Sequence, residues 1–234
     1  MNPINYFYKY HPFVWLQTRI SLKLRKEIFK HLPIYPGLSV LEVGTTPDME
    51  RVDSNYFSRQ AKLLGCHVSV TSPENCLQMA SKLGFNLIPF DRFLNGISSS
   101  ERFDLVISSA VIEHVGNEIQ KKEHLELLDR SSQKYIAIIT PHRYHWVEFH
   151  TMLPFFHWLP KKIHRLFLRC VGMSRWADES HLDLLSLKEF VEINRQVFRN
   201  RKIRFKTFHF LGAISNLLAI VENESQTGLP ITPK

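Results

Sequence analysis

Histidine and carboxylate side chains gather in one short stretch of this sequence. Residues 141–151 contain His142, His145, Glu148 and His150, and Glu179 and His181 follow in the next segment. A histidine with an ordinary pKa of about 6.5 can remove a proton near neutral pH. In an extended segment Glu148 and His150 lie on one face, so the carboxylate can orient the imidazole.

We therefore predict His150 as a general base, with Glu148 and His181 as further catalytic candidates. The alternative for His150 is a structural role, in which its ring hydrogen-bonds the backbone of this segment. The spacings match no recognised metal-binding pattern, so no metal site is expected.

A second group of polar residues follows two apolar runs. Residues 40–43 lead to Gly44, and residues 103–108 lead to Glu113 and His114. Short apolar runs bounded by turn residues predict buried strands. In an open α/β sheet, ligands bind beyond the carboxyl ends of such strands. The sequence therefore predicts a ligand site after these two runs.

Strand and helix patterns alternate along most of the chain. Strands are expected at 40–43, 66–71, 86–89, 103–108, 135–140, 203–211 and 215–221. Helices are expected at 14–32, 54–64, 72–83, 118–130, 164–169 and 185–197, with Ser54, Ser72 and Asn117 as N-terminal caps. This alternation predicts a mainly parallel sheet.

The length of 234 residues fits a single domain. We divide it into an N-terminal helical segment (1–34), a core (35–141), an insert (142–184) and a closing helix with two strands (185–222). Because the insert follows the fifth strand, we expect it to cover the carboxyl edge of the sheet.

Glu42-x-Gly44 after the first strand and Glu113-His114-Val115 after the fourth resemble the class I S-adenosylmethionine-dependent methyltransferases, in a type 11/23-like form with a degenerate glycine loop. The resemblance covers about residues 35–222. It implies a Rossmann-like, seven-stranded, mainly parallel sheet in the order 3-2-1-4-5-7-6, with helices on both faces and the last strand pair antiparallel. It also implies S-adenosyl-L-methionine as the cofactor.

The resemblance assigns cofactor contacts to the ends of four strands: Glu42, Gly44, Thr45, Thr71, Ser72, Asp91, Ser109, Ala110 and His114. Glu42 would pair with the cofactor ammonium, or else only order the loop. Asp91 would lie near the adenine, or else be a solvated loop acid. His114 would shape the pocket, or else belong to the start of a helix.

Two departures from the family pattern affect this expectation. Thr46 and Asp48 occupy positions where the family has glycine, and β-branched residues tolerate positive φ poorly. The loop must therefore follow a different path. The family also commonly ends its second strand with an acid that binds the ribose, whereas this chain has Val70 and Thr71 there.

The net charge of +8 favours anionic partners. Basic residues cluster at 23–30 and 161–169, interleaved with apolar ones, which suits an interfacial helix better than a nucleic-acid arm. We therefore expect membrane-surface contact through 153–170, or else solvated helix faces, and no nucleic-acid partner. Without a spanning run or a signal-peptide core, we expect a cytoplasmic protein.

The leading expectation is transfer of a methyl group from S-adenosylmethionine to a hydroxyl of a small, glycan or lipid-linked acceptor. A segment resembling His-Thr-x-x-Pro-x-x-His-Trp-Leu-Pro, at residues 150–160, suggests bacterial enzymes of glycan or lipid modification. The alternative is a non-catalytic binding module or partner subunit that keeps the fold. The degenerate loop and the missing ribose acid favour this alternative, and the histidine-rich insert argues against it.

Overall fold

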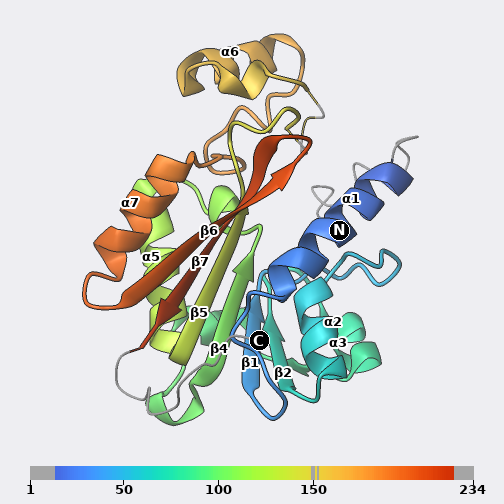
Figure 1. The fold of residues 1–234 in the computed structure, drawn as a ribbon, viewed down its shortest axis with the longest axis vertical. Helices are drawn as coiled ribbons and strands as arrows, with labels where there is room; N and C mark the ends of the chain where they lie inside the picture. The colour runs from blue at the N-terminus through green and yellow to red at the C-terminus, as the bar shows by residue number, and fades with distance from the viewer. Residues whose placement is uncertain (1–13, 149–150, 152, 224–234) are drawn as a thin grey trace.

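The computed structural model describes residues 14–148, 151 and 153–223 (Figure 1). Seven strands form one sheet in the order β3-β2-β1-β4-β5-β7-β6, which confirms the predicted topology. The pairs β5–β7 and β6–β7 are antiparallel, and the other neighbours are parallel. The strands are β1 (Ser39–Val43), β2 (His67–Thr71), β3 (Asn86–Leu87), β4 (Phe103–Ser109), β5 (Ser132–Pro141), β6 (Lys202–Phe210) and β7 (Ala213–Glu222).

The register of the parallel strands aligns their carboxyl ends. Val43 is paired with Thr71 of β2 on one side and with Ser108 of β4 on the other. The loops that leave β1, β2 and β4 therefore start at one edge of the sheet, which we call the carboxyl edge.

Helices cover both faces of the sheet (Figure 1). They are α1 (Val14–Phe29), α2 (Tyr56–Leu63), α3 (Leu77–Leu83), α4 (Phe90–Leu94), α5 (Glu118–Ser131), α6 (Lys161–Cys170) and α7 (Leu187–Val197), with short 3-10 turns η2 (Ser99–Glu101), η3 (Ile112–His114) and η4 (Phe156–Trp158). The first three helices lie on one face, whereas α5 and α7 lie on the other.

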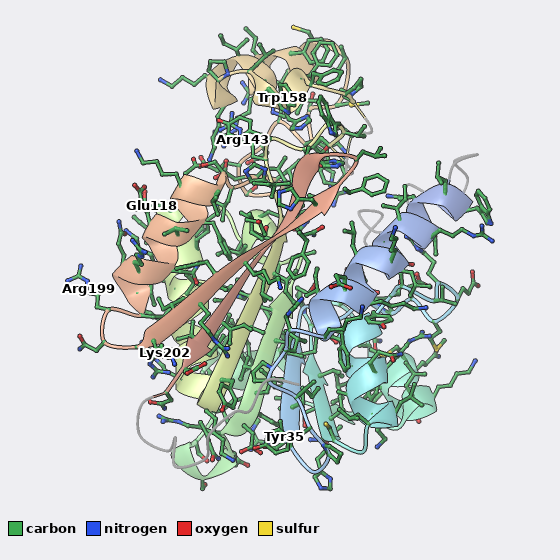
Figure 2. The ribbon with its side chains drawn as sticks, in the orientation of Figure 1. Tyr35, Glu118, Arg143, Trp158, Arg199 and Lys202 are labelled. Atoms are coloured by element: carbon green, nitrogen blue, oxygen red, sulfur yellow. The ribbon has the colours of Figure 1, made fainter. Side chains whose placement is uncertain are left out.

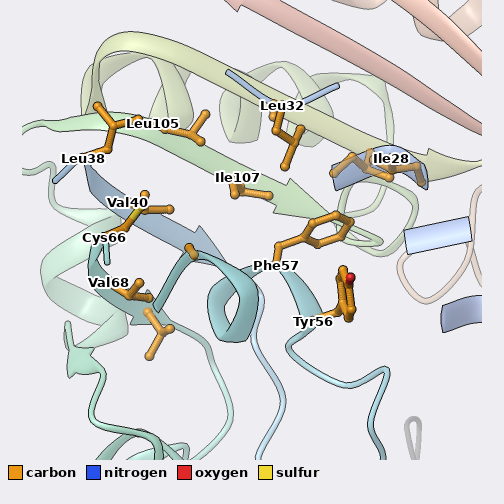
Figure 3. Close-up of a cluster of buried hydrophobic side chains, with 14 of the residues drawn as sticks. Ile28, Leu32, Leu38, Val40, Tyr56, Phe57, Cys66, Val68, Leu105 and Ile107 are labelled. Carbon is orange, nitrogen blue, oxygen red and sulfur yellow. The ribbon is translucent and has the colours of Figure 1, made fainter. Parts of the chain in front are cut away.

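Alternation along β1 divides its side chains between two cores. Val40 belongs to the core formed with Ile28 and Phe57, part of which Figure 3 shows. Leu41 and Val43 belong to the core on the opposite face. Because successive residues of a strand point to opposite faces, Glu42 shares the face of Val40 and points toward α2.

The residues at the helix N-termini explain which predicted helix starts are confirmed and which are wrong. Asn117 forms the predicted cap of α5 through a capping box with Gln120. The predicted Ser54 cap is wrong: its hydroxyl bonds Asp48, and α2 begins after Asn55. The predicted helix start at Ser72 is also wrong, because the hydroxyl oxygen of Ser72 accepts a bond from Glu74 N at 3.1 Å in a turn, and α3 begins at Leu77.

The insert carries a small core of its own at one end of the long axis of the molecule (Figure 1). Leu168 of α6 packs there with Trp176, Ala177, Leu182 and Leu184. Below this core, the buried carboxylate of Asp183 forms ion pairs with cations from two helices: Lys121, Lys161 and Arg165. The pair with Lys121 joins the insert to α5, and the other two pairs lie within the insert. Within the described ranges, the structure contains no helix of the length and apolarity needed to cross a bilayer.

We predict that Leu168→Ala destabilises the insert by about 2–5 kcal/mol, because Leu168 is fully buried and its removal leaves a cavity. Hydrogen exchange should show reduced protection of backbone amides mainly in residues 161–184. Leu166→Ala is the matched control on the same helix. Leu166 is 61% exposed, so its loss should change stability by no more than about 0.5 kcal/mol. Equal effects of the two changes would contradict this packing.

Candidate functional site

Glu42, the second-last residue of β1, is a buried carboxylate held by α2. Ser58 N donates to Glu42 Oε2 at 2.8 Å, and the Ser58 hydroxyl donates to the same oxygen. Ser58 therefore does not use Oε1. Burial raises the pKa of the Glu42 carboxyl, while the Ser58 bonds and the charge of Arg25 oppose the rise.

Arg25 brings a guanidinium from α1 to the same region. Its Nε donates to Ser21 Oγ at 3.1 Å, and its Cζ lies 5.7 Å from the centre of the Phe57 ring. Burial lowers the pKa of Arg25, and the carboxylates of Asp53 and Glu42 oppose this shift. The sequence analysis did not identify Arg25. The sequence signal that could have identified Arg25 is its position directly after Leu24, which belongs to the apolar stripe of the expected helix.

Gly44 is required by the packing of the first loop. Its φ is +86°, and an added Cβ would lie 2.3 Å from Val111 Cγ2. Gly44 N donates to Thr71 O at 2.9 Å, which ties the loop to β2. Val111 of the β4 loop therefore fills the space beside Gly44.

Asn55 holds the next part of the loop where the resembled family has glycines. Its side chain accepts a bond from Thr46 N at 2.9 Å and donates to Thr46 O at 2.8 Å. Thr45 is buried, with its hydroxyl 3.9 Å from Cys76 Sγ. Asp48 accepts from Glu50 N at 2.9 Å. Side chains thus define this loop.

At the end of β2, Thr71 is fully buried, and its hydroxyl has no hydrogen-bond partner within the described part of the chain. Ser72 is also buried and shapes the following turn. Asp91 is exposed in the first turn of α4. Their predicted contacts to ribose and adenine stay predictions.

At the end of β4, two small residues leave the backbone accessible. Ser109 is half-buried, and Ala110 is exposed with a φ of +55°. Beneath them, Ser108 Oγ lies 3.0 Å from His124 Nε2. Burial lowers the pKa of His124 to about 4, so its imidazole is neutral at physiological pH.

Glu113 and His114 fasten the insert to the carboxyl edge. Asp183 N donates to Glu113 O at 2.7 Å, and His114 Nδ1 donates to His181 O at 2.6 Å. The Glu113 side chain is fully buried and accepts from Thr140 Oγ1 at 2.9 Å through Oε2. Its Oε1 has no hydrogen-bond partner among the described residues. Burying a carboxylate oxygen without a hydrogen-bond partner lowers the free energy of unfolding. This marks Glu113 as a candidate functional group.

The three predicted catalytic residues are placed differently. Glu148 is buried in the insert, and its Oε2 accepts from Thr151 N at 2.6 Å. His150 lies outside the described residues, so its pairing with Glu148 stays a prediction. His181 contributes its carbonyl to His114, and its ring Nδ1 lies 3.0 Å from Ser180 Oγ.

The structure also has a small hollow inside the insert rather than at the carboxyl edge. Arg143, His157 and His164 contribute to its lining. Arg143, labelled in Figure 2, donates to the carbonyls of His157 at 3.2 Å and Leu159 at 2.7 Å. Burial lowers the pKa of His164 to about 4. These groups mainly serve the internal structure of the insert.

Known proteins match this chain in fold and not in sequence. No protein-family model matches it, and no curated protein matches it. A solved S-adenosylmethionine-dependent methyltransferase of Thermotoga maritima, described as a possible histamine N-methyltransferase, is 14% identical, with 94% of this chain and 97% of that chain covered and a TM-score of 0.57.

Magnesium protoporphyrin IX methyltransferase of Synechocystis, solved with S-adenosylhomocysteine, is 11% identical, with 88% of this chain and 84% of that chain covered and a TM-score of 0.54. A Rhodobacter sphaeroides structure described as a putative zinc-dependent alcohol dehydrogenase is 12% identical, with coverage of 83% and 87% and a TM-score of 0.57. The chain therefore has the Rossmann-like fold of the class I methyltransferases.

We predict that Glu42→Gln stabilises the protein at pH 7. Because burial raises the folded-state pKa of Glu42, the ionised carboxylate destabilises the fold above that pKa. Glutamine removes the charge and keeps an oxygen for Ser58. Denaturant unfolding should show a higher free energy of unfolding at pH 7, with the gain vanishing as the pH falls below the ordinary value of about 4.3.

Asp104→Asn is the matched control at the opposite ends of the same strands. Burial alone would raise the pKa of Asp104, but bonds from Lys134 and Ser39 lower it. Asp104 therefore contributes stability above its ordinary pKa, which is lost as the pH falls through the lowered value. The control should be destabilised at pH 7. A Glu42→Gln variant that is also less stable at pH 7 would contradict the burial argument.

Proposed function

We propose that the protein is an S-adenosylmethionine-dependent methyltransferase. The observation that carries the proposal is the pair of opposite charges at the carboxyl edge. Glu42 offers a carboxylate oxygen that Ser58 does not use, and Arg25 offers a half-buried guanidinium. The amino-acid part of S-adenosylmethionine carries an ammonium and a carboxylate. These two charges would pair with Glu42 and Arg25 respectively.

The remaining groups at the edge also fit this cofactor. Its other polar atoms would meet the loop at Thr45 and the Thr71 hydroxyl, which lacks a partner within the described ranges. The accessible backbone at Ser109 and Ala110 offers a flat contact where larger side chains would obstruct a ligand. His114, held by the insert, would close the pocket beside them. Bound there, the cofactor would supply an electrophilic methyl group.

The acceptor in this proposal is a hydroxyl of a small, glycan or lipid-linked molecule. Methyl transfer to oxygen needs in-line alignment and removal of the hydroxyl proton. His150 would take that proton, and the buried carboxylate of Glu148 would orient its ring. Support for this assignment comes from the position of Glu148, which lies in the insert that Glu113 and His114 attach to the edge.

A second function, a non-catalytic module with the same fold, is favoured by two observations. Val111 occupies the space beside Gly44, and the end of β2 offers hydroxyls rather than an acid. Such a module would keep the fold as a partner subunit and bind the cofactor weakly. Cofactor binding separates the two functions.

We predict that S-adenosylhomocysteine binds the purified protein in the micromolar range in isothermal titration. Glu42→Ala and Arg25→Met should each weaken binding by about ten- to a hundredfold, since each removes a charged hydrogen-bond partner. Asp104→Asn should bind like the parent, because Asp104 lies at the amino end of β4. Absence of binding up to millimolar ligand would reject the methyltransferase and support the non-catalytic module.

We further predict that His150→Ala abolishes turnover without changing the affinity for S-adenosylhomocysteine. The loss of a general base typically costs about 10²–10⁴-fold in rate. The measurement uses an acceptor found by screening hydroxylated sugars and lipids, with Glu148→Gln as the companion variant. An equal loss of cofactor affinity in His150→Ala would instead indicate a structural histidine.

A further inference from the structure

The end of the molecule that carries α6 (Figure 1) includes several large apolar side chains that are exposed. We call this surface the apolar end, and it comprises Trp146, Phe155, Phe156, Trp158, Leu159, Ile163, Leu166, Val171 and Leu211. Their exposed fractions range from 37% to 74%. Leu211 lies in the turn between β6 and β7. Its backbone carbonyl accepts a hydrogen bond from Trp146 Nε1 at 2.9 Å. A contiguous exposed patch of this kind marks an interaction site.

The aromatic part of the apolar end is held in place by internal contacts. Trp158, which is labelled in Figure 2, donates from Nε1 to His145 O at 2.9 Å, so the polar atom of this indole is used within the insert. The ring centres of Phe155 and Trp158 are 5.1 Å apart. The rings of Phe156 and Phe167 are stacked, with their centres 4.2 Å apart. The surface is therefore preorganised, and it presents mainly carbon to the outside.

Helix α6 presents two different faces. Leu168 packs into the insert core, whereas Ile163 and Leu166 lie on the opposite side with 52% and 61% of their surface exposed. Lys162 and Arg169 are exposed along the flank of this apolar stripe. A short amphipathic helix with cations beside its apolar face suits the boundary between headgroups and acyl chains.

The charge of this region has one sign. Residues 149–177 contain Lys161, Lys162, Arg165, Arg169 and Arg175, and no aspartate or glutamate. Lys161 and Arg165 face inward and pair with Asp183. Lys162 and Arg169 form no ion pair within the described part of the chain. Two cations therefore remain available to an anionic partner.

We propose that the apolar end docks onto the surface of an anionic phospholipid bilayer. The aromatic and aliphatic side chains would enter the headgroup region, while Lys162 and Arg169 would meet lipid phosphates. A second copy of this chain fits less well, because it would bring the same cations against each other. This inference is independent of the cofactor, and it would place the insert next to acceptors at the membrane surface.

The test is sedimentation of the full-length protein with vesicles of phosphatidylcholine, with and without phosphatidylglycerol. We expect binding to the vesicles that contain phosphatidylglycerol, weakening as salt rises. Lys162→Glu and Arg169→Glu should each reduce the partition coefficient by about fivefold or more. Ile163→Ser and Leu166→Ser should each reduce it by about tenfold.

The matched controls are Ile119→Ser on α5 and Leu63→Ser on α2. These residues are 68% and 81% exposed and lie away from α6, so both variants should bind vesicles like the parent. Unchanged circular dichroism and thermal unfolding would show that each variant is folded, so that any loss concerns the membrane alone, whether or not the protein binds S-adenosylhomocysteine.

Three results would overturn the proposal. These are no vesicle binding, equal binding to phosphatidylcholine alone, and equal losses in the control variants. Light scattering checks whether a second copy of the chain, rather than a membrane, covers the apolar end. A concentration-dependent dimer that Ile163→Ser dissociates would assign the apolar end to a second copy of the chain instead.

Discussion

The parallel register between β1 and its two neighbours is the constraint on which the candidate site depends. Because Val43 is paired with both Thr71 and Ser108, three loops leave the sheet at one level. Gly44 then allows the loop after β1 to turn while Val111 packs against it. A shift by one residue would reverse the faces of β1 and turn Glu42 away from α2.

The insert is joined to this edge by both backbone and charge. The carbonyl of Glu113 and the ring of His114 bond the segment that contains Asp183. The Asp183 carboxylate in turn pairs with Lys121 of α5. A buried carboxylate surrounded by cations is strongly destabilised when one partner is lost, so this connection favours a single position of the insert.

Several buried polar groups at the edge lower stability rather than raise it. Burial raises the pKa of Glu42 and so disfavours its ionised form, and Oε1 of Glu113 has no hydrogen-bond partner among the described residues. Such groups persist in folded proteins mainly where a ligand or a reaction uses them. By contrast, the buried His124 has a simpler structural role, since its low pKa keeps it neutral beside Ser108.

The residue pattern by itself determined the type of nearly every element, whereas the order of the strands followed from the resemblance to a known family. Apolar runs bounded by turn residues indicate strands locally, and the cap at Asn117 depends only on its neighbours. The same local logic failed at Ser72, because its hydroxyl accepts a bond in a turn and the helix starts five residues later, at Leu77.

Only the tertiary structure decided which groups face each other at the carboxyl edge. Arg25 is one of several basic residues in its helix, and its position near Glu42 and Phe57 depends on how α1 packs against α2. Likewise, no local pattern indicates that Val111 fills the space beside Gly44 or that His181 supplies a carbonyl to His114. Local sequence determines strands and caps because their interactions span a few residues, whereas these contacts join residues that only the packed fold brings together.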